Sequence, residues 1–321
     1  MTGHLSLPNH GWLSQYPERY WGVSAFGWEG TSVQVNYFAY GVITPALSYT
    51  LSVLGSLLAL VCTTRARRIA DKGRRARWLL LAAASLGGTG IWVMHFMAMI
   101  GFQITDQSIR YDISLTAASL ITAIVVVAIG LLIVGYGKPN PLKIIAAGIL
   151  TGVGVAGMHY TGMAAMQMPG HIGYDRNIVI LSVVIAVVAA TVALWFTVTL
   201  RNPVALGVAA LIMGIAVNGM HYTAMYALKV SDFVAKPVSG LLPLMFLGPI
   251  VIFVIATIAV LLFALLSRTG LDAAESERTV RLAPGTMPPA VPTQPTGPEN
   301  SAQANAAARA TSAAAFVNRR R

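Results

Sequence analysis

Residues 113–135 read ISLTAASLITAIVVVAIGLLIVG, a stretch without a charged side chain. A helix rises 1.5 Å per residue, so this stretch is long enough to cross about 30 Å of hydrocarbon, as uncharged apolar stretches of 18 or more residues typically do. Further stretches share this character. We expect seven spans, at about residues 41–62, 78–101, 113–135, 143–167, 177–199, 203–228 and 242–267. The sequence therefore predicts an all-α membrane protein.

The composition of the whole chain supports this class. Hydrophobic residues make up 56% of the chain and charged residues only 10%, and the mean hydropathy is +0.68. Soluble domains carry about 25% charged residues, so a soluble globular fold is excluded. The net charge of +11 does not indicate nucleic-acid binding, because the basic residues gather in one connection and at the C-terminus. Such a distribution is typical of residues that set membrane topology.

The connection after the first span, residues 63–77, decides the expected orientation. It contains seven Lys and Arg residues and a single acid, Asp71. Short loops rich in Lys and Arg stay in the cytoplasm. We therefore expect a multi-pass protein of the cell membrane with its N-terminus outside and its C-terminus in the cytoplasm. Residues 1–36 contain no apolar stretch typical of a signal peptide.

Four segments follow from this topology. We expect an extracytoplasmic N-terminal segment at residues 1–37, a membrane domain built of repeats at 38–230, and a last loop with the seventh helix at 231–267. Residues 268–321 are rich in Ala, Pro, Thr and Gln and contain nothing that could build a core. This composition predicts a disordered cytoplasmic tail. The single cysteine, Cys62, lies in an apolar stretch and cannot form an internal disulfide.

The second, fourth and sixth spans carry related motifs near one end. They read MHFMAM at residues 94–99, MHYTGM at 158–163 and MHYTAM at 220–225, and a glycine lies seven residues before each histidine. The repeating unit is thus a helix hairpin whose second helix bears the motif. The expected fold has three such two-helix repeats and one final helix. Repeats of two spans keep their orientation, so their axis runs along the membrane normal.

The three histidines are expected at one depth. Each lies six to nine residues before the outer end of its expected span, which corresponds to about 10 Å at 1.5 Å per residue. Three parallel helices would then present equivalent imidazoles in one layer. Each histidine also has a methionine four residues later on the same helix face. The candidate metal ligands are His95, His159, His221, Met99, Met163, Met225 and, as weaker partners directly before each histidine, Met94, Met158 and Met220.

The chemistry of this set favours copper. The expected spans contain no Asp or Glu, which hard cations such as Ca²⁺ and Mg²⁺ prefer. Imidazole and thioether together are a soft set that suits copper, especially Cu(I). Outer hydrogen-bonding partners are expected among Tyr160, Tyr222, Thr161, Thr223 and Asn218. Buried His and Met residues also serve as packing groups, but a threefold recurrence at one depth favours a functional role.

The motifs resemble those of the MHYT family of bacterial integral membrane sensor proteins. Residues 158–161 and 220–223 are full matches, whereas the first copy reads MHFM at 94–97. The resemblance covers residues 38–230. It implies a sensor that binds copper through Met and His and responds to oxygen, carbon monoxide or nitric oxide. Many members carry cyclic-dinucleotide signalling domains, for which residues 268–321 are too short, so output is expected through an unidentified cytoplasmic partner.

Two other interpretations stay open. A copper handling or transport protein would need ligands at several depths, whereas the motifs lie in one layer. A membrane haem protein would use facing histidines as axial ligands. The chain is not expected to be an enzyme, because it contains no nucleophile–base constellation, phosphate-binding loop or dinucleotide fingerprint. The expected partners are the lipid bilayer and the cytoplasmic signalling partner, and no nucleic acid.

Overall fold

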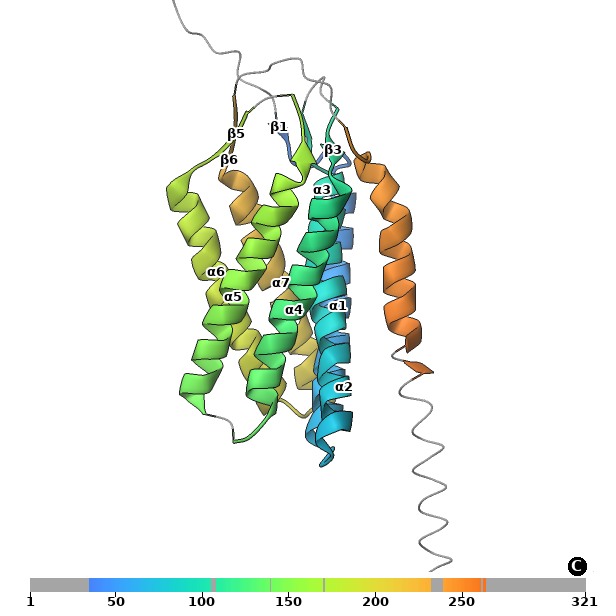
Figure 1. The fold of residues 1–321 in the computed structure, drawn as a ribbon, viewed down its shortest axis with the longest axis vertical. Helices are drawn as coiled ribbons and strands as arrows, with labels where there is room; N and C mark the ends of the chain where they lie inside the picture. The colour runs from blue at the N-terminus through green and yellow to red at the C-terminus, as the bar shows by residue number, and fades with distance from the viewer. Residues whose placement is uncertain are drawn as a thin grey trace, which may run out of the picture. The chain divides into compact units, whose positions relative to one another are not determined.

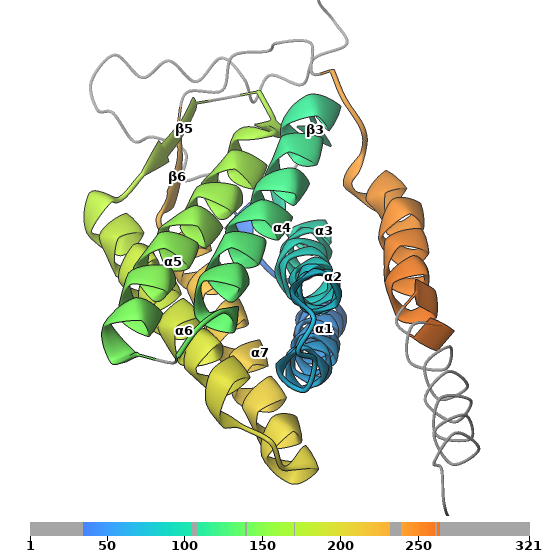
Figure 2. The same cartoon turned by 60° about the horizontal axis from the view of Figure 1, so that its bottom comes forward.

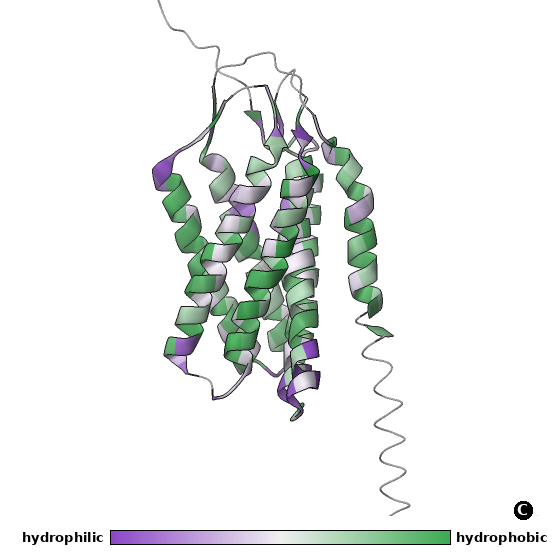
Figure 3. Ribbon diagram, viewed as in Figure 1, coloured by the Kyte–Doolittle hydropathy of each residue, from purple (hydrophilic) through white to green (hydrophobic). Residues whose placement is uncertain are grey.

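The computed structural model describes residues 35–104, 108–138, 140–169, 171–231, 239–260 and 262–263. Residues 1–34 of the expected N-terminal segment and the whole expected tail lie outside these ranges. Within the described residues, seven helices are long and apolar enough to cross a membrane. Their middles are hydrophobic, and hydrophilic residues gather at their ends (Figure 3). The predicted all-α multi-pass class is therefore confirmed.

The spans agree with the sequence to within a few residues. They are Ile43–Arg67 (α1), Lys72–Ile100, Ile113–Gly135 (α4), Pro141–Ala164 (α5), Arg176–Thr199 (α6), Pro203–Tyr226 (α7) and Pro243–Val260 (Figure 1). The largest correction concerns the basic connection, which is much shorter than residues 63–77. Asp71 accepts a hydrogen bond from the Arg74 backbone N–H at 2.8 Å and thereby caps the next helix, so helix begins again at Lys72.

The second span is composite. It consists of α2 (Lys72–Ala83), a π-helical segment at Ala84–Val93 and α3 (Met94–Ile100). The π-helical segment is rich in glycine, and a Cβ atom at Gly55 of α1 would lie 2.3 Å from the Gly90 backbone nitrogen. The two backbones therefore touch where neither residue has a side chain. Interruptions of this kind occur frequently at functional sites, and this one ends directly before the first motif.

Each repeat is closed by a short antiparallel strand pair, which the sequence did not indicate. In every copy the strand before the first helix pairs with the strand after the second helix. The pairs are β1 (Val35–Asn36) with β2 (Gln103–Ile104), β3 (Arg110–Tyr111) with β4 (Met166–Gln167), and β5 (His171–Tyr174) with β6 (Leu228–Ser231). The repeating unit is thus strand–helix–helix–strand, and all three strand pairs lie at the motif end of the helices (Figure 1).

The three hairpins close into a ring of six helices (Figure 2). The second span contacts α4, α5 contacts α6, and α7 returns to contact α1. The motif-bearing second helix of each hairpin therefore has neighbours on both sides within the ring. The seventh span contacts the second span, where Phe246 stacks on Phe96 with ring centroids 5.4 Å apart and Phe253 lies 6.5 Å from Trp92.

Candidate metal centre

The three motif histidines come from the second helix of each repeat. His95 lies in α3, His159 in α5 and His221 in α7, and each stands five residues before the last residue of its helix. This places all three at one depth, about 7.5 Å from the helix end at 1.5 Å per residue. The expected distance of six to nine residues was slightly too large, because the helices end earlier than the expected spans.

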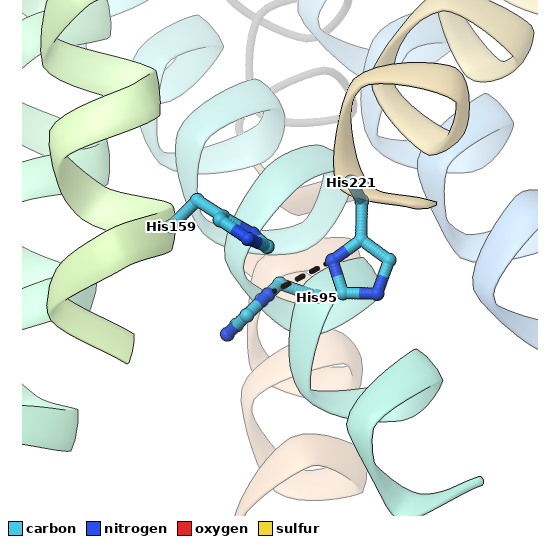
Figure 4. A group of neighbouring side chains, drawn as sticks. All are labelled: His95, His159 and His221. Atoms are coloured by element: carbon cyan, nitrogen blue, oxygen red, sulfur yellow. Dashed lines mark hydrogen bonds between the residues drawn. The ribbon is translucent and has the colours of Figure 1, made fainter. Parts of the chain in front are cut away.

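The imidazoles meet at one point between their helices (Figure 4). One ligand atom from each histidine lies within 4.8 Å of the other two, and the Nδ1 atoms of His95 and His221 are 3.1 Å apart. The ring centroids form a nearly equilateral triangle with sides of 4.9, 5.0 and 5.1 Å. Nitrogens bound at 2.0–2.1 Å to one tetrahedral ion lie about 3.3 Å apart. Small side-chain rotations would therefore suffice for all three imidazoles to bind one ion.

These imidazoles are buried, and apart from the hydrogen bond between His95 and His221 most of their ring nitrogens have no partner. Each of the three residues is only 1% exposed. Nε2 of His95 and both ring nitrogens of His159 have no hydrogen-bond partner. A buried polar atom without a partner typically costs about 1–3 kcal/mol, so the protein is expected to satisfy these nitrogens with a ligand. Among the described residues, this is the one group of three or more His, Cys, Asp or Glu side chains that could hold a metal ion.

The six methionines predicted as ligands are buried in the same three helices. Their exposed fractions are 1–2% for Met94, Met99, Met158, Met163, Met220 and Met225. The methionines four residues after each histidine stand one turn nearer the strand end. Their burial fits the predicted soft ligand set, and their role as ligands stays a prediction.

An aromatic ring follows each histidine and packs edge-on against its imidazole. The centroid distances are 4.8 Å for Phe96, 5.1 Å for Tyr160 and 5.0 Å for Tyr222. After the histidine, the three copies therefore share an aromatic ring and not a hydroxyl group. The Tyr160 hydroxyl shares a hydrogen bond of 2.8 Å with Ser182 of α6, so it braces two helices and does not orient an imidazole.

Three more of the expected outer partners form hydrogen bonds elsewhere. Asn218 accepts from the Ser48 hydroxyl of α1 at 2.9 Å. Thr161 and Thr223 donate to backbone carbonyls four residues earlier in their own helices. The expectation that these side chains bond to the histidines is therefore wrong for Asn218 and both threonines. Their hydroxyl and amide groups are within easier reach of neighbouring backbone and of α1.

One residue of the site was missed by the sequence analysis. A Cβ atom at Gly162 of α5 would lie 2.6 Å from Nε2 of His95, so only glycine leaves room for this imidazole. The equivalent positions are Ala98 and Ala224 in the other two copies. The difference between MHYTGM and the other motifs was visible in the sequence, but only the tertiary arrangement reveals its meaning.

An apolar cavity of about 340 Å³ lies next to the histidines, on the side away from the strands. Ile91, Val155 and Val217 line it, and each stands four residues before a motif histidine. Met220 also lines the cavity, and Thr151 is the one polar residue in the lining. The cavity therefore begins about one turn from the imidazoles and offers almost no hydrogen-bonding group.

With this geometry in place, comparison with known proteins identifies the repeat. Residues 88–147 and 152–210 match MHYT, described as "Bacterial signalling protein N terminal repeat". The chain thus contains two MHYT repeats. The matched regions include the first two motif histidines, and the third motif histidine lies in a further strand–helix–helix–strand unit of the same kind.

Curated relatives of this chain are signalling proteins. It is 38% identical over 195 residues to the bifunctional diguanylate cyclase/cyclic di-GMP phosphodiesterase MucR of Pseudomonas aeruginosa, covering 59% of this chain and 28% of MucR. It is 32% identical over 192 residues to the cyclic di-GMP phosphodiesterase NbdA of the same organism, covering 58% of this chain and 24% of NbdA. It is also 25% identical over 208 residues to the signaling protein YkoW of Bacillus subtilis, covering 63% of this chain and 26% of YkoW. The chain thus spans about a quarter of each of these relatives, and no solved structure matches it.

Proposed function

We propose that this chain is a membrane sensor that holds one copper ion between His95, His159 and His221. The observation that carries the proposal is the convergence of three buried imidazoles on one point, with ring nitrogens of His95 and His159 that have no hydrogen-bond partner. The family and the relatives are signalling proteins of the membrane, which supports a sensory role.

Copper follows from the chemistry of the donors. Three neutral imidazoles bind first-row transition metals, and the buried thioethers one turn away favour the reduced ion Cu(I). The group of potential ligands contains no carboxylate, so Ca²⁺ and Mg²⁺ would find no suitable oxygens. When bound, the ion would supply a redox centre and a site to which a diatomic molecule attaches.

The signal we propose is a diatomic gas (oxygen, carbon monoxide or nitric oxide) or the redox state. Such gases are small, uncharged and soluble in hydrocarbon. An apolar cavity of this kind stays dry and accepts apolar molecules. The cavity beside Ile91, Val155 and Val217 would let a gas reach the histidines from the bilayer without crossing a polar layer.

The alternative functions fit the geometry less well. A haem bound between two histidines needs the breadth of its ring between them, whereas all three imidazoles lie edge to face with centroids about 5 Å apart. A transport route needs successive sites at different depths, whereas the metal-capable group found among the described residues occupies one depth.

We also propose that the basic helix ends face the cytoplasm, with the N-terminus outside. The α1–α2, α4–α5 and α6–α7 connections all lie at the end opposite the strand pairs, and the seven basic residues of positions 65–77 gather there (Figure 1). The chain itself would have no enzymatic activity and would pass its signal to a cytoplasmic partner. In this orientation, Ala70→Cys should react with a membrane-impermeant thiol reagent only after the cells are opened.

Metal analysis tests the proposal most directly. The protein is purified without chelator from copper-replete cells and reconstituted in nanodiscs, and we expect one copper per chain. A variant with all three histidines changed to alanine serves as the matched control and should bind none. A Soret absorption band in the parent protein would indicate haem, and a parent protein without bound metal would leave the histidines as packing groups.

A further inference from the structure

Three arginines meet in a second cavity at the end of the bundle opposite the strands. This cavity has a volume of about 220 Å³. Its basic residues are Arg67 from the end of α1, Arg75 from α2 and Arg201 from the connection between α6 and α7. Apolar residues of α4, including Leu131 and Val134, form part of its wall. All three repeats therefore contribute to it.

The positive charges in this cavity are not neutralised by the protein. The lining residues include no Asp or Glu. The two ion pairs formed among the described residues, Arg74 with Asp71 and Lys229 with Asp175, involve none of the three arginines. The neighbouring charges that act on Arg67 are both positive, from Arg201 and Arg68. Guanidinium groups gathered in this way repel one another unless an anion lies between them.

Two of the arginines are held in place and still have donors to spare. Arg67 donates through Nη2 to the Leu200 carbonyl, while its Nη1 is buried without a partner. The Arg75 guanidinium lies 5.5 Å from the centroid of the Tyr136 ring, while its Nε is also buried without a partner. Guanidinium groups with fixed planes and free N–H donors are the preferred ligands of phosphate oxygens.

We infer that this cavity binds a phosphate group. The need to hold basic residues in the cytoplasm accounts for the number of arginines in this region but not for their arrangement. Arg68, Arg74 and Arg77 come from the same short stretch and are exposed outside the cavity. The three lining arginines come from α1, α2 and the α6–α7 connection and line one space, with Arg67 and Arg75 partly buried and Arg201 at its exposed side. A bound phosphate would link the ends of all three repeats. The inference is independent of the proposed copper site, which lies at the other end of the helices.

Two sources can supply the phosphate, namely a lipid headgroup at the membrane surface or a free phosphate from solution. The experiment uses the full chain in nanodiscs of a galactolipid, whose headgroup contains no phosphate, and follows its melting temperature. In one arm phosphatidylglycerol is added to the bilayer, and in the other inorganic phosphate is added to the buffer at constant ionic strength. A rise in the first arm alone identifies a lipid headgroup, and a rise in the second identifies free phosphate.

Matched variants decide whether the cavity is responsible. Arg201→Gln and Arg75→Gln should each weaken the effect at least about tenfold, the loss typical of a charge-assisted hydrogen bond. Arg77→Gln removes the same charge from an exposed position of α2 and should change nothing. The inference is overturned if neither additive raises the melting temperature, or if Arg77→Gln weakens the effect as much as the two cavity variants do. Since two cavity variants are used, failure of one to assemble does not prevent the decision.

Discussion

The first motif copy and the two later copies hold equivalent histidines in different surroundings. Phe96 and Met97 of the first copy are 1% and 6% exposed, whereas the matching Tyr160 and Thr161 are half-buried. In the second span 83% of the most apolar stretch is buried, against 39% in both α5 and α7. The copy whose sequence differs from MHYT is thus the one with apolar surroundings.

The seventh span explains this difference. Phe246 stacks on Phe96, and Tyr111 packs against both rings with centroids 5.8 and 5.6 Å away. A hydroxyl at position 96 would be buried among aromatic rings, whereas the Tyr160 hydroxyl reaches Ser182. The three repeats are therefore equivalent at the imidazoles. They differ where the seventh helix covers the first repeat.

The largest effect is expected from the histidines themselves. If the site is shared, His95→Ala, His159→Ala and His221→Ala should each remove most of the copper. Affinity should fall by roughly a hundredfold or more, beyond the 10–100-fold cost of changing an outer-shell residue. Copper per chain after dialysis against a weak chelator measures this. His171→Ala, the same change in strand β5, is the control. A loss of one third for each variant would mean three separate ions.

Gly162→Ala adds a single methyl group and should disturb the equivalent placement of the three imidazoles. The new Cβ atom would lie 2.6 Å from Nε2 of His95, so the imidazole of the first copy must move. Overfilling a packed site typically costs about 1–3 kcal/mol. We expect lower thermal stability together with weaker copper binding. Gly157→Ala in the same helix meets nothing within 4 Å and is the matched control. Equal behaviour of the two variants would show that the imidazole is not seated against α5.

Exchange of Phe and Tyr between the first two copies should change the stability of the protein by a smaller amount. Phe96→Tyr places a hydroxyl in the ring cluster around Phe246 and should cost about 1–3 kcal/mol of stability. Tyr160→Phe removes the bond to Ser182 and should cost only about 0.5–1.5 kcal/mol. Thermal unfolding in nanodiscs measures both. If Phe96→Tyr were neutral, the covering by the seventh span would not be the reason for the first copy's departure.

The sequence predicted those features that depend on hydropathy and on repetition. Spans such as residues 113–135 and the three motifs follow directly from local composition. The strand pairs did not, because strands of two residues, such as Val35–Asn36, show no alternation. The π-helical segment at Ala84–Val93 packs closely against the backbone of Gly55, which belongs to another helix, and such a contact cannot be seen in local composition.

The expected outer hydrogen bonds failed for a related reason. Asn218 was placed correctly on the motif helix, but its partner Ser48 is 170 residues away in the chain. A polar side chain bonds to whichever group the tertiary fold brings nearest, and a single sequence does not reveal that group. Convergence of the histidines was predictable because the repeat itself fixes their relative depth.

The smallest effect concerns the strand ends of the second and third repeats. Asp112 caps α4 and Asp175 caps α6, but only Asp175 also forms an ion pair, with Lys229 at 2.9 Å. The hydrogen bond from Lys229, and those from two backbone N–H groups of α6, hold the pKa of Asp175 below its ordinary value of 3.8. A lowered pKa in the folded state stabilises the protein above the unfolded pKa, and this contribution disappears as the pH falls through the folded value.

Asp175→Asn isolates this contribution, because Asn remains a good helix cap but cannot pair with Lys229. We expect a slight loss of stability near neutral pH, smaller than for any change above, because the pair is largely exposed and is screened by salt. The loss should vanish below the folded pKa of Asp175, where the parent carboxyl is also neutral. Asp112→Asn, which keeps the cap of α4 and breaks no ion pair, is the control, and melting temperatures at pH 7 in low and high salt measure both. Two results would contradict this, namely a loss of stability that persists in high salt or an equal loss in both variants. Either would show that the charge at the cap matters and that the pair with Lys229 does not distinguish the third repeat from the second.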